Sequence, residues 1–137
     1  MVITQRTNAE DFKKIIKDSP VHCTWTVDDI QRIMIPLLKR QQVLFAYDND
    51  QLQGLVTWAW VEPETAEGYI NGTQKLSSEA LTGSTGDLWA IDFIAPYGNV
   101  KDVLKAFTKR FKELHPEHSQ AKMFRRMKGY VSKVTLR

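Results

Sequence analysis

The chain has few of the residues that build disulfides, metal clusters and membrane spans. It contains one cysteine, Cys23, among 137 residues, which excludes an intrachain disulfide and a multi-cysteine metal site. Only three histidines are present; two of them, His115 and His118, have no evident third ligand, so we expect no metal. No apolar run approaches the roughly 20 residues that cross a bilayer, and residues 1–8 lack a signal-peptide pattern. We therefore expect a cytoplasmic protein without a transmembrane segment.

The length and composition are those of a globular chain. Hydrophobic residues make up 42% of the sequence and charged residues 26%, which suits a compact unit with a substantial core. We expect one domain over residues 1–137.

The charge is distributed unevenly along the chain. Residues 1–100 hold eight Lys and Arg against 13 Asp and Glu, a net of −5, whereas residues 101–137 hold 11 against three, a net of +8. This asymmetry suggests an anionic partner for the C-terminal part: nucleic acid, a phosphorylated cofactor, an anionic membrane surface or an acidic protein. The alternative is a set of solvated helix faces.

One acid, Asp92, stands inside an apolar run over residues 88–95 that is typical of a buried strand. An ionised carboxylate is costly to bury alone, so Asp92 must be paired, hydrogen-bonded, protonated or at an accessible strand end. His22 follows a helix stop at Ser19-Pro20, where a short loop can direct a side chain into a cleft. We expect His22 to be the partner of Asp92.

The remaining pattern predicts an α+β fold. Helical spacing after the N-caps Asn8 and Thr26 predicts two helices, the second of which Pro36 should kink or break. We expect further helices over residues 77–81 and 100–114, and strands over residues 43–47, 52–61, 88–95 and 130–136, the first two forming a hairpin. The sheet should be mixed but mainly antiparallel and flanked by helices. Trp58 and Trp60 lie two residues apart and so share one face of a strand, and tryptophans in this pattern usually belong to the hydrophobic core.

Two motifs occur in order and are together fairly specific. The first is Ser19-Pro20-x-His22-x-x-Trp25, and the second, about 70 residues later, is Ile91-Asp92-Phe93-Ile94-Ala95-Pro96-Tyr97-Gly98. They resemble the toxin-activating lysine acyltransferases of the hemolysin-activating (RTX toxin) type, and the resemblance spans roughly residues 18–134. It implies an N-acetyltransferase-like (GNAT-like) fold that often dimerises through sheet edges. It also implies transfer of a fatty acyl group from acyl carrier protein to an internal lysine of a target protein. In the second helix, Ile33 and Met34 stand where the best-known members carry a polar asparagine.

The resemblance also implies roles for particular residues. His22 is the candidate base or nucleophile, Asp92 would orient and stabilise its ring, and Ser19 would hydrogen-bond the loop or the oxyanion. Trp25, Trp58 and Trp60 become candidates for an acyl groove. Five basic residues become candidates for binding the acidic carrier protein: Lys105, Lys109, Arg110, Arg125 and Arg126.

Several alternatives remain open at this point. A nucleic-acid-binding module would explain the basic C-terminal part but leaves His22 and Asp92 without a role. A catalytically inactive relative acting as a binding protein is the second alternative, and a coenzyme-A-dependent acetyltransferase is the third. Residues 96–99 contain one glycine instead of a glycine-rich phosphate loop, which favours acyl carrier protein as the co-substrate and no bound cofactor. Cys23 adjoins His22, but consecutive residues usually point in different directions, so a Cys23 nucleophile is disfavoured.

Overall fold

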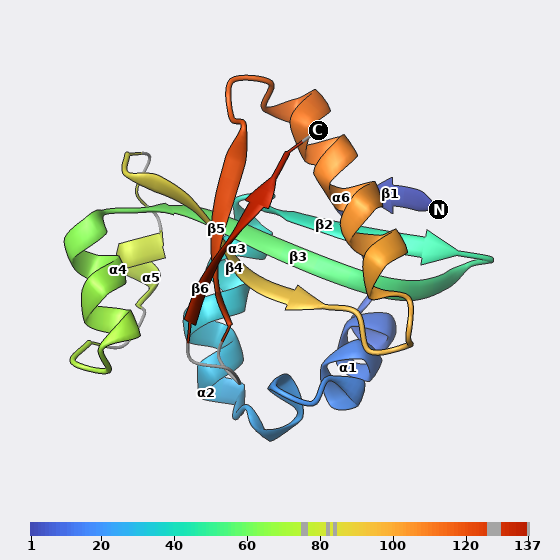
Figure 1. The fold of residues 1–137 in the computed structure, drawn as a ribbon. Coiled ribbons are helices and arrows are strands. Elements are labelled where there is room, and N and C mark those ends of the chain that lie inside the picture. The colour runs from blue at the N-terminus through green and yellow to red at the C-terminus, as the bar shows by residue number, and fades with distance from the viewer. Residues whose placement is uncertain (75–76, 82, 84, 126–129, 137) are drawn as a thin grey trace.

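A computed structural model describes residues 1–74, 77–81, 83, 85–125 and 130–136 (Figure 1). The described elements are, in chain order, β1 (Val2–Thr4), α1 (Ala9–Asp18), the 3₁₀ turn η1 (His22–Thr24), α2 (Val27–Asp29), the π-helical turn η2 (Ile30–Met34), α3 (Ile35–Lys39), β2 (Val43–Asp48), β3 (Gln51–Val61), α4 (Pro63–Ile70), α5 (Ser78–Leu81), β4 (Asp87–Ile94), α6 (Val100–Leu114), β5 (Gln120–Arg125) and β6 (Tyr130–Thr135).

The strands form one six-stranded sheet in the order β1-β2-β3-β4-β5-β6. Neighbouring strands are antiparallel except β4 and β5, which α6 connects and which pair in parallel through Trp89 with Lys122 and Ala90 with Met123. The sheet confirms the predicted mixed, mainly antiparallel architecture. The hairpin of β2 and β3 is also confirmed, and its turn places Asn49 and Asp50 at positive φ.

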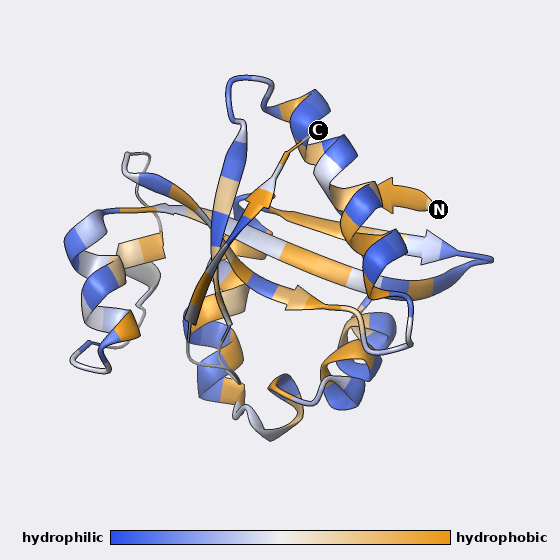
Figure 2. Cartoon of the chain, in the orientation of Figure 1, coloured by the Kyte–Doolittle hydropathy of each residue, from blue (hydrophilic) through white to orange (hydrophobic). Residues whose placement is uncertain are grey.

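Helices cover both faces of the sheet (Figure 1). On one face α6 packs through a cluster that includes Trp58, Val103 and Phe107, and its sheet-facing side is the hydrophobic one in Figure 2. On the other face α1 and the α2–α3 segment pack through two clusters that include Ile15, Leu37 and Trp25. The sheet therefore separates two apolar layers, which matters for the site.

The predicted helix ends are confirmed by their hydrogen bonds. The Asn8 side chain accepts from the Asp11 N–H at 2.7 Å and begins α1, which ends before Pro20. Thr26 and Asp29 form a reciprocal capping box at the start of α2. The irregularity expected at Pro36 is the π-helical turn η2, in which the Ile35 N–H bonds to the Ile30 carbonyl immediately before proline removes a backbone donor.

Three elements were not predicted from sequence: β1, α4 and β5. Helix α4 has Pro63 in its first turn and contains Gly68, a poor helix former, which hid the helix in the sequence. Strand β5 alternates buried Ala121 and Met123 with the less buried Gln120, Lys122 and Phe124. Its charge made it read as a basic cluster, although its period of two is that of a half-buried strand.

Candidate active site

His22 sits in a short loop whose backbone is held by α1. The Ser19 N–H bonds to the Ile16 carbonyl at 3.2 Å, and the Cys23 N–H bonds to the Ser19 carbonyl at 3.0 Å. The Trp25 ring packs against the imidazole with centroids 4.5 Å apart. His22 is 2% exposed. The loop after α1 therefore fixes one buried imidazole in one orientation.

A β-bulge in β4 turns Asp92 toward His22. Thr57 pairs with Asp92 while its neighbour Trp58 pairs with Ala90, so Ile91 is the extra residue. Ile91 packs in the cluster that contains Leu37, on the face covered by α1 and the α2–α3 segment, and Asp92 then lies on the same face, against His22. With strict alternation Asp92 would face α6. The bulge therefore places the acid on the face of the sheet that carries the histidine.

The imidazole of His22 bridges a serine and an aspartate. Its Nε2 lies 2.7 Å from Asp92 Oδ1, and its Nδ1 lies 2.8 Å from Ser19 Oγ. The Ser19 Oγ also accepts the His22 backbone N–H at 3.2 Å, which leaves the hydroxyl hydrogen free to point at Nδ1. Assigned from this network, Nδ1 accepts and Nε2 carries the proton that it donates to Asp92.

The second oxygen of Asp92 is held by Thr57. The Thr57 hydroxyl donates to Asp92 Oδ2 at 3.3 Å and accepts the Asp92 backbone N–H at 3.1 Å. Asp92 is 1% exposed and Thr57 is fully buried, so both carboxylate oxygens have donors in a water-poor place. Sequence reasoning missed Thr57, although it is the polar residue in an otherwise apolar stretch of β3.

The two sequence motifs meet at a second point. Tyr97, in the turn after β4, donates to Asp18 Oδ2 at 2.7 Å, next to Ser19 at the end of α1. Burial and the bond to Asp18 both raise the pKa of Tyr97 above its ordinary value of 10.0. The tyrosine therefore fixes the end of α1 relative to β4.

The capping box fixes the other side of the loop. The Thr26 N–H donates to Asp29 Oδ2 at 2.9 Å and lowers the pKa of that carboxyl below its ordinary value of 3.8. Because Thr26 directly follows Trp25, this cap holds the tryptophan that packs on His22.

A groove of about 260 Å³ leads from the surface to His22. We call it the α1 groove. It is lined by Phe12, Lys13, Ile16, Lys17, His22, Cys23, Trp25 and Ile30. Cys23 is exposed on it, whereas the ring nitrogens of His22 are engaged by Ser19 and Asp92.

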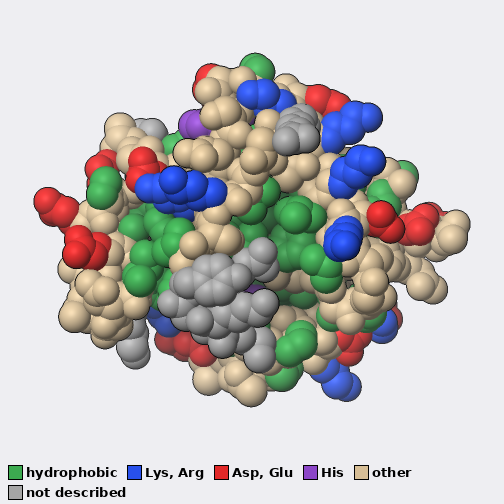
Figure 3. All heavy atoms as spheres, viewed as in Figure 1, with side chains coloured by type: hydrophobic (Ala, Val, Ile, Leu, Met, Phe, Trp, Pro, Cys, Tyr) green, Lys and Arg blue, Asp and Glu red, His purple; other side chains and the backbone are tan. Residues whose placement is uncertain are grey.

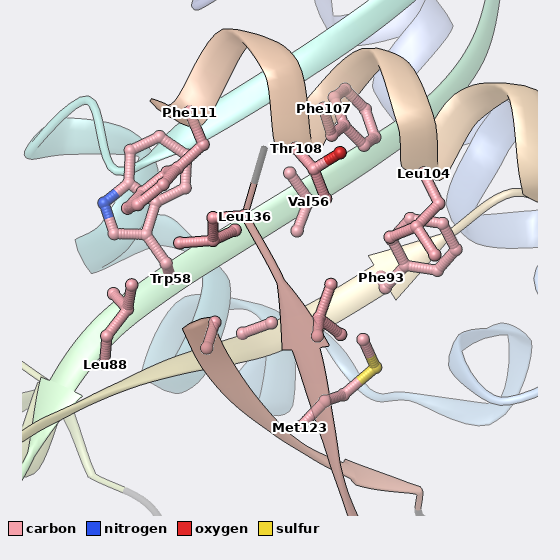
Figure 4. A pocket seen from close by; sticks show the side chains of 13 residues that line it. Val56, Trp58, Leu88, Phe93, Leu104, Phe107, Thr108, Phe111, Met123 and Leu136 are labelled. Atoms are coloured by element: carbon pink, nitrogen blue, oxygen red, sulfur yellow. The ribbon is translucent and has the colours of Figure 1, made fainter. Parts of the chain in front are cut away.

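A separate small apolar cavity of about 50 Å³ lies on the opposite face of the sheet, beneath α6 (Figure 4). Trp58 lines this cavity and Trp25 lines the α1 groove. Trp60 lies elsewhere, with its Nε1 donating to His118 Nε2 at 3.3 Å. The structure therefore does not bring together the three tryptophans predicted for one acyl groove, because Trp58 and Trp25 belong to opposite apolar layers.

The predicted partner-binding residues lie away from His22. Lys105, Lys109 and Arg110 are exposed on α6, where Figure 3 shows basic side chains, and Arg110 pairs with Glu113 at 3.0 Å. Helix α6 packs on the face of the sheet opposite His22. Arg126 and the side chain of Arg125 lie outside the described residues.

Two further features concern only the described part of the chain. No helix there is long and apolar enough to cross a membrane. No three His, Cys, Asp or Glu side chains there come together as a metal-binding group.

Comparisons with known proteins agree on one family. The model of the RTX toxin acyltransferase family matches residues 13–135. A leukotoxin-activating lysine-acyltransferase, LktC, from Pasteurella haemolytica-like sp. (strain 5943B) is 33% identical over 89 residues, which are 64% of this chain and 53% of the relative. The RTX-II toxin-activating lysine-acyltransferase ApxIIC of Actinobacillus pleuropneumoniae is 30% identical over 95 residues, 69% of this chain and 58% of the relative.

A third relative adds the kind of acyl group. The protein-lysine myristoyltransferase HlyC of Escherichia coli is 30% identical over 94 residues, 68% of this chain and 54% of the relative. The chain spans just over half the length of these relatives.

Proposed function

Because the chain belongs to the RTX toxin acyltransferase family, we propose that it transfers a fatty acyl group from acyl carrier protein to the side-chain amine of a lysine in a target protein. The observation that carries this proposal is the buried chain of hydrogen bonds through Ser19, His22 and Asp92. A base oriented by a carboxylate is the arrangement that acyl transfer needs.

The chemical obstacle is the acceptor amine. A free lysine has a pKa of about 10.4 and is almost wholly protonated at neutral pH, so its nitrogen needs a base before it can attack a thioester. In His22 the nitrogen that accepts a proton is Nδ1, since Nε2 carries the hydrogen that is donated to Asp92. In this mechanism the Ser19 hydroxyl, bonded to Nδ1, relays the proton from the incoming amine.

The reaction then balances in two stages. The ammonium first loses one proton to solvent; the resulting amine attacks the thioester carbonyl carbon while a second proton passes through Ser19 to Nδ1, and Asp92 stabilises the imidazolium that forms. The tetrahedral intermediate collapses, the carbon–sulfur bond breaks, and the imidazolium returns the proton to the departing thiolate. The products are an amide on the target lysine and a free thiol on the carrier.

A two-step route uses the same residues. The 2.8 Å contact between Ser19 Oγ and His22 Nδ1 has the geometry of a nucleophile and its base, so the acyl group can pass first to Ser19. Direct attack by His22 Nδ1 is the other two-step route, and it requires the bond to Ser19 to break. Mass spectrometry of the enzyme with charged carrier and no acceptor distinguishes the routes, because only a two-step route leaves an acyl group on the protein.

The finer features of the proposal follow the family. The parallel β4–α6–β5 unit within an antiparallel sheet supports an N-acetyltransferase-like domain over residues 1–137. The sheet edges at β1 and β6 are where a homodimer would form. We place the protein in the cytoplasm, where charged acyl carrier protein is found.

The test is an acyl-transfer assay by mass spectrometry with myristoyl-charged carrier protein and a lysine-containing acceptor domain. We expect His22→Ala and Asp92→Asn to lower transfer roughly 10² to 10⁴-fold while the proteins stay folded. Thr24→Ala is the matched control in the same loop, and its rate should stay within about threefold of wild type, since Thr24 is exposed and lies outside both the hydrogen-bonded chain and the α1 groove. A folded wild-type protein that transfers nothing to several toxin acceptors would refute the proposal, as would an active His22→Ala variant.

A further inference from the structure

We propose that the acyl carrier protein docks beside α1, and that its phosphopantetheine arm reaches His22 along the α1 groove with Lys13 and Lys17 binding the phosphate of the arm. This inference rests on the proposed function. It differs from the sequence-based expectation, which assigned the carrier to the basic residues of α6.

The first observation is the position of the α1 groove. His22 lines the groove, and the apolar part of the lining consists of Phe12, Ile16, Trp25 and Ile30. A thioester arm carries an apolar chain and amide groups, so an apolar groove ending at a histidine suits it. The cavity beneath α6 is also apolar, but His22 does not line it.

The second observation is the charge on the groove. Lys13 and Lys17 are exposed, lie four residues apart on α1, and both line the α1 groove. In the part of the chain that the structure describes, neither ammonium has an ion-pair partner, and no acidic side chain lines the groove. Two cations beside an apolar groove form a site for a phosphodiester rather than for a neutral chain.

The other lysine in the middle of α1 provides the contrast. Lys14 points to the far side of the helix, where it lies 3.6 Å from Asp18 and contacts Tyr97. On that side Lys14 lines one hollow with Asp11 of α1 and Asp50 of the turn between β2 and β3, so the charges there are mixed. Helix α1 therefore presents paired charges away from His22 and unpaired positive charges toward it.

The basic face of α6 has a larger charge but the wrong position. Lys105 and Lys109 project from a helix that packs on the opposite face of the sheet from His22. Charges steer a partner effectively only within about one Debye length, roughly 8 Å at physiological ionic strength, so charges across the sheet do little for an arm that ends at His22. A carrier bound over α6 would lie across the sheet from His22.

The experiment compares two matched charge reversals in the full chain. Lys13→Glu/Lys17→Glu changes the groove, and Lys105→Glu/Lys109→Glu changes α6 at the same spacing of four residues. Lys14→Glu is a further control on α1. Acyl transfer from myristoyl-charged carrier is measured against carrier concentration at fixed saturating acceptor, and against acceptor concentration at fixed saturating carrier, at about 20 mM and about 200 mM salt. Circular dichroism and urea unfolding check that each variant is folded.

We expect the groove variant to lower kcat/KM for the charged carrier about tenfold or more at low salt and less at high salt. Its KM for the acceptor should stay unchanged, and the α6 and Lys14 variants should stay within about threefold of wild type. Carrier protein without an acyl group should bind more strongly with the phosphopantetheine arm attached than without it. This difference should be seen only in variants that keep Lys13 and Lys17. Myristoyl-coenzyme A carries the same arm and phosphate without the carrier protein, so its use as acyl donor should fall by a similar factor in the groove variant.

Other outcomes overturn the inference. If the α6 variant loses carrier-dependent activity and the groove variant does not, the carrier docks over α6. If the groove variant raises only the acceptor KM, the groove binds the target protein. In both cases wild-type transfer persists, so the proposed function stands; absence of transfer by wild type refutes the proposed function itself.

Discussion

Asp92→Asn separates the chemical role of the buried carboxylate from its structural role. In the protein, Asp92 Oδ1 accepts from His22 Nε2 at 2.7 Å and Oδ2 accepts from the Thr57 hydroxyl at 3.3 Å. An asparagine amide can accept the Nε2 hydrogen through its oxygen and donate to Thr57 through its nitrogen. The substitution therefore removes the negative charge while leaving one hydroxyl hydrogen without an acceptor.

The expected magnitudes follow from these contacts. The buried Thr57 hydroxyl that loses its acceptor costs about 1–3 kcal/mol of the free energy of unfolding, so Asp92→Asn should remain folded. Loss of the charge that stabilises the imidazolium should lower acyl transfer roughly 10² to 10⁴-fold, or about 3 to 5.5 kcal/mol in the transition state. Asp92→Ala differs, because it leaves Nε2–H and the Thr57 hydroxyl buried without an acceptor, at about 1–3 kcal/mol each.

The assay measures single-turnover acyl transfer by mass spectrometry beside urea unfolding followed by circular dichroism. Thr57→Val is the control, since it removes the hydrogen bond to Oδ2 and keeps the charge; it should lose about 1–3 kcal/mol of stability but less than about tenfold in transfer. If Asp92→Asn transfers as fast as wild type, or if Thr57→Val is equally inactive while folded, the charge of Asp92 has no catalytic role.

Three further predictions concern the scaffold. Gly86→Ala should lower the free energy of unfolding more than Gly72→Ala. Both glycines have positive φ, where an alanine costs about 1–3 kcal/mol of strain, but only at Gly86 would the new Cβ lie 2.5 Å from a backbone oxygen. Equal urea midpoints for the two variants would contradict this. Leu37 is fully buried, so Leu37→Ala should lower the free energy of unfolding in urea by about 2–5 kcal/mol. A loss below about 1 kcal/mol would show that the core beneath the α2–α3 segment is not packed as described. Asp29→Asn should lower the free energy of unfolding, because the Thr26 N–H favours the ionised Asp29 carboxyl only in the folded protein. The difference from wild type should be fully present above the ordinary pKa of 3.8 and should narrow as the pH falls through the lower pKa of the folded state. A difference that does not change between about pH 6 and about pH 2 would count against the cap.

Local chemistry made several features readable from the sequence. Asn8, Pro20 and Thr26 mark helix ends by satisfying or removing backbone hydrogen bonds, and the structure has helix ends at each. The requirement that a buried acid have a partner pointed from Asp92 to His22, and the two are bonded. Strand β5 was missed because its charged residues hid a period of two.

The sequence by itself determined which residues are available for the chemistry and that His22 follows a helix end; the tertiary structure decided which of them meet. Asp92 faces His22 only because Ile91 bulges, and a bulge depends on the register with β3, which no local pattern states. Trp25 and Trp58 lie in opposite layers because the sheet passes between them. The same separation distinguishes Lys13 and Lys17, which line the groove at His22, from the more numerous basic residues of α6. Composition fixes the net charge, but the attraction that a charged partner feels depends on its distance from each charge, which only the tertiary structure sets.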